Sequence, residues 1–155
     1  MNDQKVCIID PKDKYAPYLL RIINKPDVYV WLSNHHPWNI EKVLRRFKSG
    51  IFKIIVVQRK IAGFINVRYM ADLSNPKEKG FYLTIAIDPK YHGQGISRKA
   101  FELFMKYLPK DIFPIGAIVS NENVKSLHFL NKLGFEHIKT FMFNNMKYDK
   151  LTFTL

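Results

Sequence analysis

One strand, and the way it ends, constrains the fold of this chain most strongly. Residues 81–87, Phe-Tyr-Leu-Thr-Ile-Ala-Ile, form a β-branched and aromatic run that is typical of a buried strand. Asp88-Pro89 ends that run, and a loop with two glycines leads directly into a helix expected at 97–108. A strand that passes through a short glycine loop into a helix indicates a sheet with helices packed on it.

The glycine loop also indicates what this unit binds. Gly93 and Gly95 allow backbone conformations that a side chain would forbid, and they let the main chain approach a ligand closely. The N–H groups of the loop and the helix dipole favour a phosphate or pyrophosphate there. The P-loop spacing is absent, and Arg98 stands where a dinucleotide fingerprint needs its third glycine. A plain strand–turn–helix connection is the alternative.

The rest of the chain supplies more strands and helices, with no internal repeat. The other strands are expected at 6–9, 52–58, 61–69, 113–119, 135–143 and 147–155. The other helices are expected at 16–23, 27–32, 40–49 and 124–133. Loops are expected at 33–37 and 72–79, and turns at Arg59-Lys60 and Asn144-Asn145. This order predicts a mixed-sheet α/β or α+β domain.

Length and composition exclude several classes of protein. The chain has 155 residues, which is enough for one ordinary domain, and 47% of them are hydrophobic, so whole-chain disorder is excluded. Cys7 is the one cysteine, which rules out a disulfide scaffold and a cysteine-based zinc site. With a polar start and no long apolar run, we expect a cytoplasmic protein without a membrane partner. We expect no metal site.

The charge has two interpretations. Lys and Arg number 25 against 13 Asp and Glu, for a net charge of +12. This surplus indicates either a soluble, lysine-rich surface or an anionic partner such as a nucleic acid, an acidic protein or a phosphorylated cofactor. The densest basic groups, 42–48 and 147–150, are short, and neither has the aromatic pattern of an RNA-binding sheet. A nucleic-acid-binding domain is therefore the least favoured alternative.

A second segment makes the interpretation more specific. Residues 123–126, Asn-Val-Lys-Ser, begin the helix after the next strand, and 132–135, Lys-Leu-Gly-Phe, end it. Together with Ile87-Asp88-Pro89 and residues 92–97, these motifs resemble the GNAT superfamily of acetyl-CoA-dependent N-acetyltransferases. The likeness covers 52–143 well and the whole chain in element order, and the branch it resembles acetylates the N-termini of ribosomal proteins. His92 and Ser97 depart from the usual Arg or Gln and Gly or Ala of that family.

The resemblance implies a fold, a cofactor and its binding residues. The fold would be a single GNAT-like domain over residues 1–155, with a mixed, mostly antiparallel sheet flanked by helices. Acetyl-CoA would be the cofactor, its pantetheine arm paired with the backbone of Ile85, Ala86 and Ile87. Its pyrophosphate would be held by Gly93, Gln94, Gly95, Ile96, Ser97 and Arg98. Asn123 would hydrogen-bond the pantetheine or adjacent backbone, or act simply as a helix N-cap.

Acetyl transfer would also require catalytic groups. Direct attack on a thioester requires a base for the amine proton and benefits from an acid for the thiolate. Many family members carry a Tyr where this chain has Leu130, and positions that often hold Glu are Phe81 and Ile118 here. We therefore consider Ser126 as the acid, with Glu78 or Tyr82 as a base acting through water. The alternatives are a small packing residue for Ser126 and a solvated charge for Glu78.

The resemblance also implies an amine acceptor. His36 and Trp38 fall in the segment that lines the acceptor pocket in this family, where an aromatic wall and an imidazole would suit an amine. The alternative is that Trp38 packs onto the core. By this resemblance the acceptor would be a protein N-terminus, an amino sugar or a small amine, and a homodimer is compatible with the family. The missing Tyr and Glu also leave open a catalytically inactive acyl-CoA-binding or regulatory module.

Overall fold

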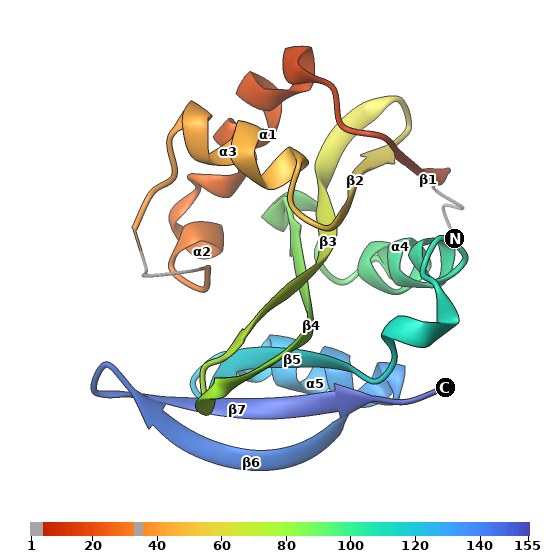
Figure 1. Ribbon diagram of the computed structural model, residues 1–155. Helices are drawn as coiled ribbons and strands as arrows, with labels where there is room; N and C mark the ends of the chain where they lie inside the picture. Colours follow the sequence, from red (N-terminus) through yellow and green to blue (C-terminus); the bar gives the residue numbers. More distant parts are fainter. Residues whose placement is uncertain (1–4, 33–35) are drawn as a thin grey trace. The chain divides into compact units, whose positions relative to one another are not determined.

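The computed structural model describes residues 5–32 and 36–155 (Figure 1). The start of the chain and part of the loop expected at 33–37 lie outside these residues. The chain forms two compact units, which we describe separately. The first contains the chain up to Asn66 together with Thr84–Leu108, and the second contains Val67–Leu83 together with Pro109–Leu155.

The strands of the described residues confirm the predicted mixed sheet. Their hydrogen-bonded order is β1-β2-β3-β4-β5-β7-β6. β4 and β5 are parallel, whereas β1–β2, β5–β7 and β6–β7 are antiparallel. β3 (Lys60–Asp72) and β4 (Asn75–Ile87) each contribute residues to both units.

The first unit combines short helices with the N-terminal strands. Its further elements are β1 (Val6–Ile9), α1 (Ala16–Ile23), α2 (Pro26–Tyr29), α3 (Ile40–Phe47), β2 (Ile51–Val57) and α4 (Ile96–Met105). In α1 the buried residues Ala16, Leu19 and Ile23 recur at helical spacing and form one apolar face. Asn39 caps α3 as predicted, because its side chain accepts a hydrogen bond from the Lys42 N–H.

An aromatic cluster lies in the core of the first unit. The Phe52 and Phe64 rings are stacked, with centroids 5.1 Å apart, and Trp38 lies 6.0 Å from Phe64. Val43 and Ile54 are fully buried in the same core. Burial of each large side chain stabilises the fold by about 1.5–3 kcal/mol, so this cluster holds α3 against β2 and β3.

The second unit contains the C-terminal elements. They are β5 (Ile115–Ser120), α5 (Val124–Leu133), β6 (Glu136–Phe143) and β7 (Met146–Phe153). Phe135 is buried and lies 5.3 Å from Phe153 between ring centroids. Gly134 ends α5 with a φ of +107°, a conformation that favours glycine. The turn between β6 and β7 is at Asn144-Asn145, as predicted.

Two sequence predictions about turns were wrong. The turn between β2 and β3 is at Gln58-Arg59, one residue earlier than predicted, and both residues have positive φ. Residues 72–79 are not a polar loop, because β3 continues to Asp72 and β4 begins at Asn75. The first residues of β4 are exposed, so backbone pairing rather than apolar burial forms this part of the strand. Their polarity therefore gave no sign of a strand.

Candidate functional site

The end of β4 is held against β3 by a close backbone approach. A Cβ atom placed on Gly63 would lie 2.0 Å from the Ala86 carbonyl oxygen, so no side chain fits at this position. The Asp88 N–H also donates a 2.7 Å hydrogen bond to the Ala62 carbonyl. These contacts fix the point at which the chain leaves the strand. Sequence reasoning placed Gly63 in a strand but gave it no role.

Asp88 anchors the segment that follows β4. Its carboxylate is buried, accepts a 2.7 Å bond from Lys25 Nζ, and caps the 3-10 turn Pro89–Tyr91 through the Lys90 N–H. Burial alone would raise the pKa of Asp88, but the hydrogen bonds from Lys25 and Lys90 outweigh it and lower the pKa. The carboxylate therefore stays ionised at neutral pH. The sequence gave no signal for the partnership with Lys25, which is 63 residues away.

The glycine loop has the backbone conformation that the sequence predicted. Gly93 and Gly95 have φ values of +77° and +74°, in the left-handed region that side chains disfavour. A Cβ atom on either glycine would meet nothing within 4 Å, so both face open space. The residues on either side of Gly93 are held by hydrogen bonds. His92 Nε2 lies 3.3 Å from the Ile87 carbonyl oxygen, and the Gln94 side-chain amide donates to the Lys90 carbonyl.

The first turn of α4 presents unpaired donors. Gly95 is the N-cap, and no side chain caps this helix. The Lys99 N–H bonds the Gly95 carbonyl, but the N–H groups of Ile96, Ser97 and Arg98 have no acceptor in the part of the chain that the structure describes. Together with the partial positive charge of a helix N-terminus, three such donors form a site for an anion. This concentration of donors is the strongest chemical feature of the loop.

The remaining cofactor candidates on β4 offer their backbone. Ala86 and Ile87 are buried, and Ile85 is half-buried. Their apolar side chains belong to the packing of the unit. Peptide groups are therefore what this strand can present to a ligand.

The two acceptor candidates lie in different surroundings. His36 is exposed, whereas the Trp38 side chain is 4% exposed and packs in the core. Asn24 holds the Trp38 backbone from both sides, donating to its carbonyl at 2.9 Å and accepting from its N–H at 2.7 Å. The position of Trp38 therefore agrees with the alternative that its side chain packs onto the core.

In the second unit, Tyr82 is part of a buried polar cluster. Its ring packs on Gly116 of β5, where a Cβ would lie 2.7 Å from Tyr82 Cε1. Its hydroxyl shares hydrogen bonds with Asp72 and Lys150, which are ion-paired with each other. Burial raises the pKa of Tyr82, so the phenol keeps its proton at neutral pH. Sequence reasoning missed Asp72, because this residue fell in an expected loop. It also missed Lys150.

The other candidates in this unit have simpler surroundings. Asn123 is the N-cap of α5, since its side chain accepts from the Ser126 N–H at 3.3 Å. The Ser126 side chain is half-buried. Glu78 is exposed and lies within β4 rather than in the loop that was expected. Leu130 is buried, so the position where many family members carry a Tyr belongs to the core.

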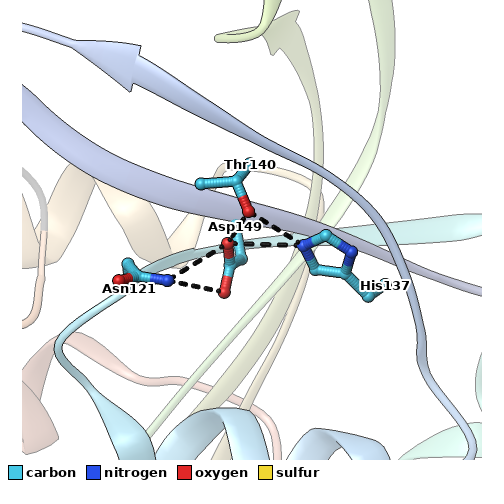
Figure 2. A network of polar contacts seen from close by, with 4 residues as sticks. All are labelled: Asn121, His137, Thr140 and Asp149. Carbon is cyan, nitrogen blue, oxygen red and sulfur yellow. Dashed lines mark hydrogen bonds and ion pairs between the residues drawn. The ribbon is translucent and has the colours of Figure 1, made fainter.

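A second polar network surrounds Asp149 of β7 (Figure 2). Asp149 is 6% exposed and accepts hydrogen bonds from Thr140 at 2.6 Å, from Asn121 at 3.3 Å and from His137 at 3.4 Å. Burial would raise the pKa of Asp149, but these hydrogen bonds outweigh it and lower the pKa. The network had not been expected from the sequence.

A β-bulge brings His137 into this network. The register of β6 on β7 shifts between His137 and Lys139, so Ile138 is the additional residue. In a regular strand, His137 and Thr140 would point to opposite faces, because they are three residues apart. The bulge turns both toward Asp149, as Figure 2 shows.

Within the described residues, no helix combines the length and apolar character needed to cross a membrane. The same residues contain no group of three or more His, Cys, Asp and Glu side chains that could hold a metal ion.

The comparison with models of protein families identifies one family. The model of the acetyltransferase (GNAT) family matches residues 17–135. Among curated protein sequences, none matches the chain.

Solved structures share the fold at low sequence identity. RimL, a ribosomal L7/L12 alpha-N-protein acetyltransferase in complex with coenzyme A, is 14% identical with a TM-score of 0.77, over 99% of this chain and 96% of that one. An acetyltransferase from Thermus thermophilus is 18% identical with a TM-score of 0.73, over all of both chains. The microcin self-immunity acetyltransferase MccE, in complex with acetyl-CoA and AMP, is 17% identical with a TM-score of 0.75, over 99% and 94%.

Proposed function

Because this chain belongs to the GNAT acetyltransferase family, we propose that it transfers an acetyl group from acetyl-CoA to a primary amine. Structures of similar fold contain CoA or acetyl-CoA. The acceptor is a protein N-terminus, an amino sugar or a small amine. The first of these is supported by the likeness to a ribosomal-protein N-acetyltransferase. We further propose that residues 1–155 act as one GNAT-like domain.

The observation that carries this proposal is the glycine loop with the unpaired donors after it. Gly93 and Gly95 adopt conformations that expose the backbone, and the N–H groups of Ile96, Ser97 and Arg98 await an acceptor. A pyrophosphate, with several anionic oxygens, fits such a group of donors. The residues present therefore suit the cofactor of the family.

Each cofactor candidate then has a defined part. The loop and the first turn of α4, residues 93–98, hold the pyrophosphate mainly through backbone N–H groups. The peptide groups of 85–87 pair with the pantetheine arm as an added strand would. Asn123 caps α5, and in this proposal its side chain also hydrogen-bonds the pantetheine.

When bound, acetyl-CoA supplies a thioester carbonyl, which a neutral amine attacks directly to give an amide and free CoA thiol. The chain must then accept a proton from the amine and give one to the thiolate. A phenol carries its proton at neutral pH and burial raises the pKa of Tyr82 further, so we propose Tyr82 for the second task rather than as the base. Lys150 and Asp72 orient that hydroxyl. Ser126 is the second candidate acid.

We propose Glu78 as the base, acting through water, since this carboxylate is exposed to solvent. His36 and Trp38 belong to the acceptor segment. His36 is exposed to an incoming amine, and Trp38 supports that segment from the core.

Calorimetric titration with acetyl-CoA, CoA and NADH tests the cofactor. We expect micromolar binding of the two CoA compounds and none of NADH. Gly95→Val should weaken acetyl-CoA binding at least about tenfold, because a β-branched side chain does not adopt the φ that the loop needs. Gly50→Val is the matched control, since Gly50 has a similar φ of +70° in an exposed turn after α3. No CoA binding by the wild type would overturn the proposal.

Thiol release separates an enzyme from an inactive acyl-CoA-binding module. The buried Leu130 in place of an acid favours the module as the second candidate. A screen of peptides, amino sugars and amines should find an acceptor that releases CoA thiol. Binding of acetyl-CoA without release for any acceptor class would favour the module.

A further inference from the structure

A pocket of about 760 Å³ in the first unit has a lining that the proposed acetyl transfer does not use. It lies against α1, the β2–β3 turn and the segment after β4. Six of its eleven lining residues are cationic: Lys14, Arg21, Lys25, Arg59, Lys60 and Lys90. Asp88 is the one carboxylate among the lining residues. The pocket is therefore strongly positive.

The positive charge of the pocket is not balanced within the chain. The Asp88 carboxylate is engaged by Lys25, 2.7 Å away, and also lies near Lys90. In the described ranges 5–32 and 36–155, no carboxylate is ion-paired with Lys14, Arg21, Arg59 or Lys60. Four cations around one hollow repel each other unless an anion lies between them.

The two arginines come from separate elements. Arg21 is on α1, and Arg59 is in the β2–β3 turn. Arg59 has a φ of +68°, where Gly, Asn or Asp would be preferred. Gln58, with a φ of +48°, precedes it, so the two residues form the two-residue turn of the β2–β3 hairpin. A guanidinium group also offers the planar, paired donors that match a phosphate.

Aromatic faces complete the lining. Tyr18 is 57% exposed, and the Arg21 guanidinium lies 5.7 Å from its ring centroid. Lys14 Nζ lies 5.5 Å from the ring centroid of Tyr15. An exposed aromatic ring beside cationic groups can stack against a planar ring that carries phosphates.

We propose that this pocket binds a phosphate-bearing small molecule other than CoA. Its volume lies within the range typical of small-ligand pockets, whereas a folded protein partner would need a much larger surface. The excess of cations over carboxylate matches a ligand with two or more negative charges. The proposal does not depend on acetyl transfer, because none of its carrying residues belongs to the glycine loop.

Titration of the full chain with ADP, with and without saturating CoA, tests this site. ADP should bind in both conditions, with an affinity that falls as salt is raised. With CoA saturating the glycine loop, Arg21→Glu/Arg59→Glu should weaken ADP binding at least about tenfold, since two charge-assisted contacts become repulsive. Both residues are exposed, so the variant is expected to fold. Lys48→Glu/Lys106→Glu changes the net charge equally at exposed positions outside the pocket and should leave ADP binding unchanged.

Two further arms identify the site and the ligand. Arg98→Glu should leave ADP binding in the presence of CoA intact, because Arg98 is outside the pocket. With CoA saturating, inorganic pyrophosphate that binds as well as ADP would show that phosphates alone suffice, whereas weaker binding would show a contribution of the aromatic base; both support the proposal. Equal loss in the Lys48→Glu/Lys106→Glu control, displacement of ADP by CoA, or binding of an acidic peptide but not of ADP would overturn it.

Discussion

Lys25 Nζ lies 2.7 Å from Asp88 Oδ1, at the point where β4 ends and the glycine loop begins. Lys25 precedes α2, so this ion pair joins the helical segment to the start of the loop within one unit. The buried carboxylate accepts the Lys90 N–H as well. The Asp88 carboxylate therefore holds the first residues of the loop in one conformation.

Asp88→Ala should destabilise the fold and loosen the loop. Removing the buried carboxylate leaves the Lys90 N–H and the Lys25 ammonium without their acceptor, which costs about 2 kcal/mol. Urea unfolding followed by tryptophan fluorescence measures this loss. Asp10→Ala is the control, because Asp10 also pairs with a lysine, Lys53, but is largely exposed and should cost less than about 1 kcal/mol. Equal losses in both variants would contradict the account of Asp88.

Gly63→Ala should be among the most destabilising glycine substitutions. The added methyl would overlap the Ala86 carbonyl oxygen of β4, so the β3 and β4 backbones would have to separate, at a cost of about 3 kcal/mol. Thermal unfolding of the variant and the wild type measures this loss of stability. Gly80→Ala serves as the comparison, because the nearest atom to its Cβ would be 3.4 Å away on a side chain. We expect it to change stability by less than about 1 kcal/mol.

Asp72 should contribute acid-sensitive stability. Burial would raise its pKa, but hydrogen bonds from Lys150 and Ser74 outweigh it and hold the pKa at about 2. A carboxyl with a depressed folded-state pKa contributes stability that is present above its unfolded value, near 4, and lost as the pH falls toward 2. The contribution at neutral pH is about 2 kcal/mol. Urea unfolding of Asp72→Asn at several pH values should therefore show a smaller loss of stability between pH 4 and 2 than the wild type shows.

Thr140→Val should weaken the network around Asp149. The Thr140 hydroxyl donates a 2.6 Å hydrogen bond to the buried carboxylate, and its loss should cost about 1 kcal/mol. Thr152→Val removes only a 3.5 Å contact with the Ile115 carbonyl and should cost less. Chemical denaturation of the two variants compares them. A larger loss for Thr152→Val would contradict the role assigned to Thr140.

Tyr82→Phe tests the proposed acid. It keeps the ring on Gly116 but removes the hydroxyl that Lys150 and Asp72 orient. We expect kcat for thiol release to fall about 10²-fold with little change in acetyl-CoA binding. Glu78→Gln should also lower kcat at neutral pH if the carboxylate is the base, because an amide cannot accept a proton from the amine. An unchanged kcat in Tyr82→Phe would remove Tyr82 from the mechanism and leave Ser126 as the candidate acid.

The sequence predicted most of the fold because its signals are local. The caps Asn39 and Asn123 and the positive φ of Gly93 and Gly95 follow from residue type and neighbours. The exposed start of β4 could not be predicted in this way, because its pairing with β3 involves no apolar alternation.

The polar clusters were missed for a different reason. Asp72 and Lys150 are 78 residues apart, and no local pattern relates them. Thr140 and Asp149 could have been paired by counting from the turn at Asn144-Asn145, since the register is regular there. The position of His137 could not have been found by counting, because the bulge at Ile138 changes the face of the strand on which His137 lies.

The central claim, that residues 93–98 bind the pyrophosphate of CoA, is tested most directly by NMR. Backbone amide resonances are followed while CoA is added to the labelled protein. The account predicts large shifts for Gly93, Gly95, Ile96, Ser97 and Arg98, because their N–H groups acquire phosphate acceptors. Saturable CoA binding that leaves these amides unshifted, or that shifts only residues around Arg21 and Arg59, would contradict it.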